Sequence, residues 1–297
     1  MNRLISWLSK RKKISFLISI AYLTAISLGH LKVSGFFDWL KEQLTFGVYD
    51  SMMRDLGAVL LLLLSLVLLH HIRKDKRRRT MGIVWWLFTA GLIVGSYEAL
   101  IVFSVETIHF VQYALLAIPV FALTMSFGET VGWVTLMGAL DEAYQYFVLY
   151  AGNRTVYLDF NDIILNLVGA GTGVLMIYTL ADIESAPLTL RARSLKRRLV
   201  SPWALTTISV IMAGLALHLS GIVELYPEAS AASAPVVLSR KLPPFRFWLR
   251  PDVGKSFHIL TPAQGILVAI VLTGVYSLMD FRFAGGPHEG GTGRKTE

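Results

Sequence analysis

Carboxyl and amide side chains are concentrated around positions 141–166, in a chain that is otherwise strongly apolar. Asp141 and Glu142 are adjacent, and Gln145 follows them by four and three residues, so one broad helix face can present all three. A carboxyl group placed in this way can act as a general acid or base, or can accept hydrogen bonds from a ligand. Because adjacent negative charges oppose each other's ionisation, we expect one carboxyl of the pair to hold a proton part of the time.

A second polar segment precedes this pair. Glu106, His109 and Tyr113 are separated by three and four residues and therefore share a helix face. Histidine changes charge near neutral pH, so His109 is a natural partner for a carboxyl group. This segment adds a proton acceptor and a phenol to the chemistry available to Asp141 and Glu142.

A third polar segment follows the pair and repeats the same spacing. It consists of Asp159, Asp162 and Asn166. Asp159 or Asn161 can also cap the helix that follows, where an acid suits the partial positive charge of the helix N-terminus. Arg154 lies in the short loop just before and could clamp an anion.

The resulting candidates divide into two groups. The candidate catalytic residues are Asp141, Glu142 and His109. The candidate ligand-binding residues are Glu106, His109, Tyr113, Asp141, Glu142, Gln145, Arg154, Asp159, Asp162 and Asn166. We expect no cofactor and no dedicated metal site, although an Asp, Glu and His cluster can bind a divalent cation, so metal-assisted chemistry stays open.

The elements that carry these residues must be membrane helices. The chain has 297 residues, of which 54% are apolar and only 16% charged, and its mean hydropathy is +0.57. The apolar residues come in long runs, which indicates a polytopic transmembrane helix bundle. There is no cysteine, which excludes disulfides and thiolate chemistry. The net charge of +8 does not indicate nucleic-acid binding, because the basic residues cluster beside the apolar runs.

We expect an all-α fold with about eight spans. They are approximately Ile14–Gly29, Leu56–Ile72, Thr80–Phe103, Ile108–Phe127, Val131–Leu149, Ile163–Leu180, Trp203–Val223 and Ala263–Met279. The first is short and follows a basic start, so a cleaved signal peptide is the alternative reading of it. The outer segment after it, with Phe36, Trp39 and Leu44 among charged residues, suits a short amphipathic helix on the membrane surface.

Lysine and arginine set the predicted orientation. The N-terminus, the 73–79 run, the 182–202 linker and the C-terminal tail hold most of the Lys and Arg residues, and an even number of spans places all four on one side. The positive-inside rule then puts both termini in the cytoplasm and the polar segments near the outer surface. Asp141 and Glu142 would lie roughly 8–12 Å below that surface. An ionised acid at such a depth costs about 2.5–3.5 kcal/mol, so it must be protonated, paired or hydrated, with Arg154 and His109 as the nearest candidate partners.

At these residues the chain resembles the VanZ-like membrane domain. The resemblance covers roughly residues 80–180 and rests on the order and context of several short motifs. The matching residues are His109, Phe110 and Tyr113, then Asp141, Glu142 and Gln145, then Arg154, and then Asp162 with Asn166, Gly169 and Gly173. The segment between the arginine and the aspartate is longer than in the family pattern, which leaves Asp159 or Asp162 as the match. The resemblance implies a role in the bacterial cell envelope related to glycopeptide (teicoplanin) resistance, and it supplies no reaction.

The resulting organisation has five parts. They are an N-terminal two-span region (1–79), a VanZ-like four-span core (80–181), a basic cytoplasmic linker (182–202), a C-terminal two-span region with a long outer loop (203–280) and a disordered tail (281–297). The linker could be an amphipathic basic helix or a disordered loop.

Three functional hypotheses follow. The first is an envelope protein of the bacterial inner membrane that recognises a lipid-linked or anionic component through the outer polar cluster. The second is a membrane-embedded acid/base enzyme that acts on a lipid headgroup. The third, a transporter, is disfavoured because no inverted repeat is visible. The expected partners are a membrane lipid or lipid-linked envelope intermediate and no nucleic acid. Outer loop 235–260, which is basic and aromatic, could dock a protein or an anionic headgroup, or simply rest on the membrane surface.

Overall fold

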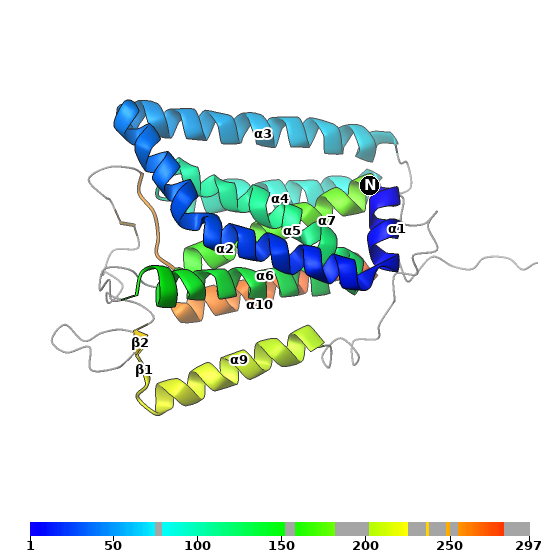
Figure 1. The fold of residues 1–297 in the computed structure, drawn as a ribbon. Helices are drawn as coiled ribbons and strands as arrows, with labels where there is room; N and C mark the ends of the chain where they lie inside the picture. The colour runs from blue at the N-terminus through cyan, green and yellow to red at the C-terminus, as the bar shows by residue number, and fades with distance from the viewer. Residues whose placement is uncertain are drawn as a thin grey trace, which may run out of the picture.

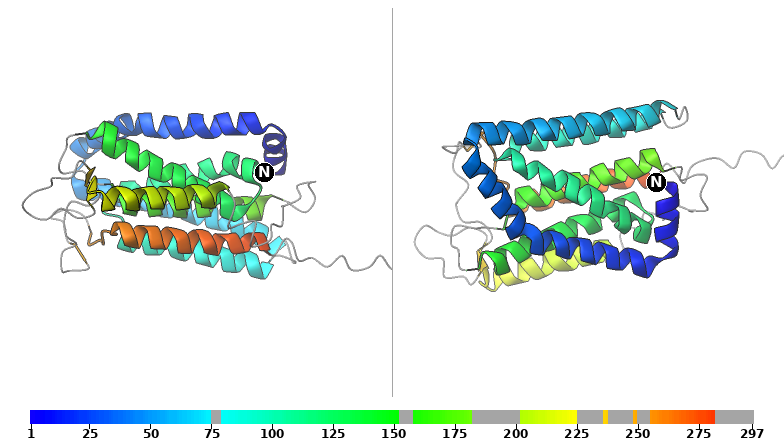
Figure 2. Two further views of the ribbon diagram at one scale, coloured as in Figure 1. Left: turned by 90° about the horizontal axis from the view of Figure 1, so that it is seen from below. Right: turned by 45° about the horizontal axis from the view of Figure 1, so that its top comes forward.

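The computed structural model describes residues 1–74, 79–151, 158–181, 202–224, 236–237, 248–249 and 255–281. The helices are α1 (Asn2–Lys10), α2 (Lys12–Gln43), α3 (Phe46–Lys74), α4 (Arg79–Ala99), η1 (Ser104–Thr107), α5 (Ile108–Thr124), α6 (Phe127–Tyr144), η2 (Gln145–Leu149), α7 (Phe160–Leu180), α9 (Pro202–Leu219) and α10 (Pro262–Phe281). Two-residue strands β1 (Val223–Glu224) and β2 (Val236–Val237) pair in parallel. The long helices run side by side along one axis (Figures 1 and 2).

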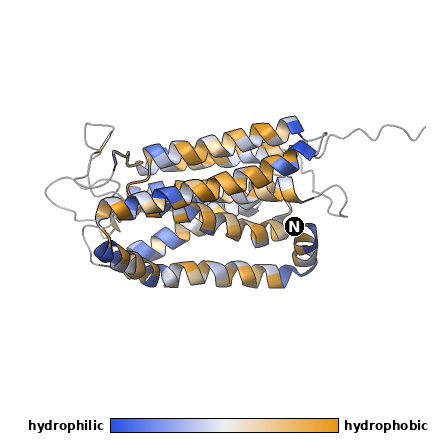
Figure 3. Cartoon of the chain, turned by 90° about the horizontal axis from the view of Figure 1, so that it is seen from above, coloured by the Kyte–Doolittle hydropathy of each residue, from blue (hydrophilic) through white to orange (hydrophobic). Residues whose placement is uncertain are grey.

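The predicted all-α membrane bundle is confirmed. Seven described helices are long and apolar enough to cross a membrane: α2, α3, α4, η1 with α5, α7, α9 and α10. Helix α6 is absent from that set. It carries Glu129, Asp141 and Glu142, yet it lies among the others in the bundle (Figure 1). Hydrophobic residues dominate the middle of the helices, and hydrophilic residues gather mostly towards their ends (Figure 3).

Helix α7 forms the centre of the bundle and packs closely against α5. Most of its residues are buried. A Cβ at Gly169 would lie 2.8 Å from the His109 carbonyl oxygen, and one at Gly173 would lie 2.4 Å from that of Ala114. Only glycine permits this approach, as is usual where membrane helices meet through small residues. The close contact fixes the register between His109 on α5 and the polar residues of α7.

Helix α10 belongs to the same core, although it lies far along the chain. Asp280 near its end accepts hydrogen bonds from Ser126 Oγ (2.8 Å) and from the backbone N–H groups of Phe127 (2.7 Å) and Gly128 (3.1 Å). A carboxylate at the N-terminus of α6 satisfies donors that no helical carbonyl can reach. Helix α9, by contrast, has no buried residue and contacts α6 where Trp203 lies over Gly132.

The bundle has two chemically different ends. At one end, which we call the site end, Asn161 at the start of α7 contacts the end of α4 and the segment before α10. The opposite end, which we call the basic end, contains α1, the start of α2, the end of α5 and the end of α10, joined through one apolar cluster. The end of α3 meets the start of α4 there, where Ile72 packs on Gly82. The direction of the chain therefore alternates from α4 to α7, as predicted.

The predicted boundaries differ from the structure in three places. The first span is not 16 residues long: α2 continues to Gln43 and includes the segment expected to form a separate surface helix. No proline interrupts that segment, so the helix continues through it. The helix is bent along its length (Figure 1). Helix α1 was not predicted; it ends where Arg11 leaves helical geometry. The fifth span changes to π-helix at Gln145.

Candidate functional site

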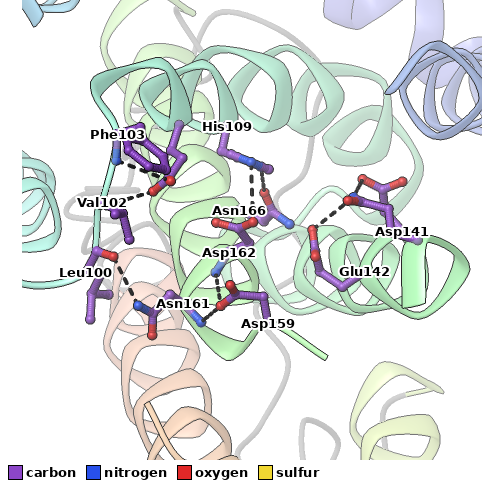
Figure 4. Close-up of polar contacts among 12 residues, drawn as sticks. Leu100, Val102, Phe103, His109, Asp141, Glu142, Asp159, Asn161, Asp162 and Asn166 are labelled. Atoms are coloured by element: carbon purple, nitrogen blue, oxygen red, sulfur yellow. Dashed lines mark hydrogen bonds and ion pairs between the residues drawn. The ribbon is translucent and has the colours of Figure 1, made fainter. Parts of the chain in front are cut away.

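The site end brings together acids from two helices around residues of a third. Asp141 and Glu142 come from α6, Asp162 from α7, and His109 from the start of α5 (Figure 4). All but Asp162 are at least nine-tenths buried. The predicted convergence of residues distant in sequence is therefore present among the described residues.

Asp141 is well supplied with hydrogen-bond donors. Tyr113 Oη donates to its Oδ2 at 3.0 Å, Gln145 Nε2 reaches the same oxygen at 3.4 Å, and Ser27 Oγ donates to Oδ1. Donors to a buried carboxylate offset the loss of its hydration. These three donors come from α5, η2 and α2, so Asp141 links three elements of the fold.

Glu142 has a different environment although it is the next residue. Gln145 Nε2, at 3.3 Å, is its hydrogen-bond donor in the described part of the chain. Its carboxyl is near enough to those of Asp162, Asp159 and Asp141 for mutual repulsion. Glu142 therefore has little to compensate a negative charge, whereas Asp141 has three donors.

His109 connects the α5 and α7 sides of the site. Its Nδ1 lies 2.8 Å from Asn166 Oδ1, and its Nε2 lies 3.8 Å from Asp162 Oδ2. Its ring also stacks on that of Tyr113, with centroids 6.3 Å apart. The expectation that His109 would pair with Asp141 or Glu142 is not met in the described contacts, because α7 lies closer and offers Asp162.

The side-chain amide of Asn166 is only partly hydrogen-bonded within the described part of the chain. Asn166 is fully buried, and its Nδ2 has no partner among the described residues. A Cβ at Gly138 would lie 2.8 Å from that nitrogen, and Gly138 is one helical turn before Glu142. Figure 4 shows the Asn166 amide between the His109 ring and the Glu142 carboxyl. Buried polar groups almost always have partners, so this nitrogen is an exception within the described part of the site.

Two residues near the site form hydrogen bonds with backbone groups. Of the two predicted N-cap candidates of α7, Asp159 and Asn161, the cap is Asp159, whose Oδ1 accepts the N–H groups of Asn161 (2.8 Å) and Asp162 (3.4 Å). Asn161 donates to the carbonyls of Leu100 and His258 and accepts from Leu260 N–H. Asn161 therefore holds the ends of three segments together.

Glu106 lies beside the cluster but folds back on its own loop. Its two carboxyl oxygens accept the backbone N–H groups of Val102 (2.9 Å) and Phe103 (3.3 Å). It is still near enough to Asp162 and Asp159 to repel them. Glu106, His109 and Tyr113, which were predicted to share one face, therefore have different roles. Glu106 holds its own loop, whereas His109 and Tyr113 contact residues of the site.

A lysine borders the same end. Lys255 Nζ lies 3.6 Å from the centroid of the Tyr97 ring, within cation–π distance. Burial lowers the pKa of Lys255, and the nearby Glu98, Glu106 and Asp50 oppose that shift. A positive charge thus lies next to the acidic cluster on its Glu106 side.

Two residues of α2 belong to the site and were missed in the sequence. Ser27 donates to Asp141. His30, one turn later, stacks edge-on against Tyr150 at 6.1 Å and interacts electrostatically with Asp141 and His109. The available signal was the three-residue spacing of two polar side chains at the C-terminal end of an apolar run. Hydropathy identifies that run as a span and does not connect its polar residues to a site on other helices.

Some expectations fall outside the described residues. Arg154, the proposed anion clamp, is one of them, as are most of outer loop 235–260, linker residues 182–201 and tail residues 282–297. Within the described residues, no group of three or more His, Asp or Glu side chains is arranged to hold a metal ion.

No protein-family model, no curated protein and no solved structure matches the chain. The functional interpretation therefore rests on the geometry of the site and on the motif resemblance.

Proposed function

We propose that this chain is a VanZ-like protein of the bacterial inner membrane, with both termini in the cytoplasm. In this proposal the site end recognises the polar headgroup of a membrane lipid or of a lipid-linked envelope intermediate. Such a role is compatible with one in glycopeptide resistance. Recognition would take place just below the outer surface of the membrane, between α5, α6 and α7.

The observation that carries this proposal is the uneven distribution of hydrogen bonds. Asp141 and Asn161 have their polar atoms engaged by the protein, whereas Glu142 has one donor and Asn166 Nδ2 has none in the described structure. Leaving a buried donor unsatisfied costs about 1–3 kcal/mol. In this proposal, the Glu142 carboxyl and the Asn166 amide nitrogen are the groups that bind the ligand.

The chemistry of the unengaged groups favours a headgroup with hydroxyls. A hydroxyl can donate to the Glu142 carboxyl and accept from Asn166 Nδ2 at once, which neither a bare anion nor an ammonium can do. Any phosphate on the same ligand would be held by Arg154 in this proposal. A lipid-linked sugar or a glycerol headgroup has both features.

The test is charge-neutral replacement of Glu142 and Arg154, separately and together, in cells that depend on the protein. Glu142→Gln and Arg154→Gln should each change the membrane-lipid profile and glycopeptide sensitivity, with little further change in the double variant. Glu98→Gln is the matched control, because Glu98 is an exposed acid at the same end of the bundle. Correctly inserted variants with unchanged lipids and unchanged sensitivity would contradict the proposal.

A second function, acid/base catalysis on a headgroup, is favoured by one observation. His109 lies between Asn166 and Asp162, an arrangement that fixes the orientation of an imidazole for proton transfer. If the protein is an enzyme, His109→Gln should retain binding of a labelled lipid extract in nanodiscs and lose its conversion. Equal binding with no product from the unaltered protein would leave recognition as the function.

A further inference from the structure

A shallow groove lies at the basic end, on the opposite side of the membrane bundle from the site. Its volume is about 460 Å³, and it is lined by Lys12, Lys13, Phe16, Leu17 and Leu123. The first four residues belong to the start of α2, and Leu123 is near the end of α5. The groove thus lies where these two helices meet.

The groove combines an apolar lining with adjacent positive charges. Phe16, Leu17 and Leu123 supply an apolar wall, and Lys12 and Lys13 border the groove at the first turn of α2. Both lysines are exposed, and neither forms a hydrogen bond or ion pair within the described part of the chain. Lysine stems can line an apolar surface while their ammonium groups reach the interface.

The backbone adds to the positive potential at this point. Helix α2 begins at Lys12 without a side-chain cap, so no N-cap side chain accepts a hydrogen bond from its first backbone N–H groups. Arg11 immediately precedes it, and its guanidinium lies 4.7 Å from the Trp7 ring centroid. Uncapped N–H groups and adjacent cations favour a phosphate, and an exposed tryptophan such as Trp7 is typical of the membrane interface.

From these features we propose that the groove binds one anionic phospholipid, with its phosphate at Lys12 and Lys13 and an acyl chain along Phe16, Leu17 and Leu123. An apolar groove bordered by two exposed lysines complements a lipid of this class. A soluble anion would not use the apolar wall, and a zwitterionic lipid would gain less from the lysines. The groove and the site are at opposite ends, so each proposal can fail without the other.

The experiment uses the full chain, purified and delipidated in detergent, with lipid binding measured by native mass spectrometry. The probes are phosphatidylglycerol and phosphatidylcholine with identical acyl chains. The unaltered protein should bind phosphatidylglycerol more tightly. A basic residue near an anionic surface contributes roughly fivefold in affinity, so Lys12→Gln with Lys13→Gln should reduce phosphatidylglycerol binding by up to about thirtyfold, towards the phosphatidylcholine value.

Two further variants distinguish lipid binding in the groove from a general attraction of anionic lipids to the basic end. Arg73→Gln with Lys74→Gln removes two positive charges from the same end on α3 and should change binding less than twofold. Leu17→Gln, at an exposed position in the groove, should weaken both lipids by a similar factor because it disturbs the acyl chain. Equal losses from the two double variants would overturn the proposal, as would unchanged binding after Leu17→Gln.

Discussion

Gly138 is the position where one added carbon should disturb the site directly. A Cβ there would lie 2.8 Å from Asn166 Nδ2 and 2.9 Å from Asn166 Cβ. Real Cβ contacts do not approach that closely, and Asn166 is fully buried. In Gly138→Ala, therefore, either α6 moves away from α7, or the Asn166 amide turns and gives up its 2.8 Å contact with His109.

The expected magnitude follows from two opposing effects. Alanine in place of glycine favours a helix by up to about 1 kcal/mol. Forcing an extra methyl into a packed interior typically costs about 1–3 kcal/mol. We therefore expect Gly138→Ala to lower the free energy of unfolding by about 1–2 kcal/mol and to change the environment of His109.

Gly95→Ala on α4 is the matched control, because a Cβ at Gly95 meets nothing within 4 Å. That variant should be as stable as the unaltered protein or slightly more stable. The free energy of unfolding would be measured in detergent micelles, and the His109 ring would be followed by NMR with labelled histidine. If Gly138→Ala matches Gly95→Ala in stability and leaves the His109 resonances in place, the deduced packing of α6 against Asn166 is wrong.

Two further predictions concern the anchors of the site and of the fold. Ser27→Ala removes a donor from the Asp141 carboxylate and should destabilise the protein by about 1–2 kcal/mol, while Ser27→Thr should recover most of that loss; equal stability of Ser27→Ala and the unaltered protein would show that α2 does not hold Asp141. Asp280→Asn replaces charge-assisted hydrogen bonds at the start of α6 by neutral ones and should cost about 1–2 kcal/mol in the same unfolding assay. Asp55→Asn, an exposed acid on α3, is its control, and an equal effect of the two would contradict the anchoring of α10.

The sequence predicted the helices better than their ends. Runs of apolar residues are enough to identify membrane helices, because each run must satisfy its own backbone in lipid. Helix ends depend on local contacts that hydropathy does not register. The continuation of α2 to Gln43 is one example, and the π-helical turn at Gln145 is another.

The candidate site shows the same limit at the level of side chains. Helical spacing correctly grouped Asp141 with Gln145, and the N-cap role of Asp159 followed from its residue type. The spacing of residues within one helix does not show which side chain of another helix lies closest to them. His109 therefore faces Asp162 rather than Asp141, and Asp141 accepts a hydrogen bond from Ser27 of α2, a residue that the sequence had not assigned to the site.

The contrast between Asp141 and Glu142 links the fold to the proposed function. Two adjacent acids in an apolar interior cannot both be ionised without compensation. Among the described residues, three donors from separate elements reach Asp141 and one reaches Glu142. Asp141 is therefore held by donors from α2, α5 and η2, and these contacts fix the relative positions of α2, α5 and α6. Under the proposed function, Glu142 is the carboxyl that remains to hydrogen-bond a headgroup, so the same pair would supply both an anchor and a ligand contact.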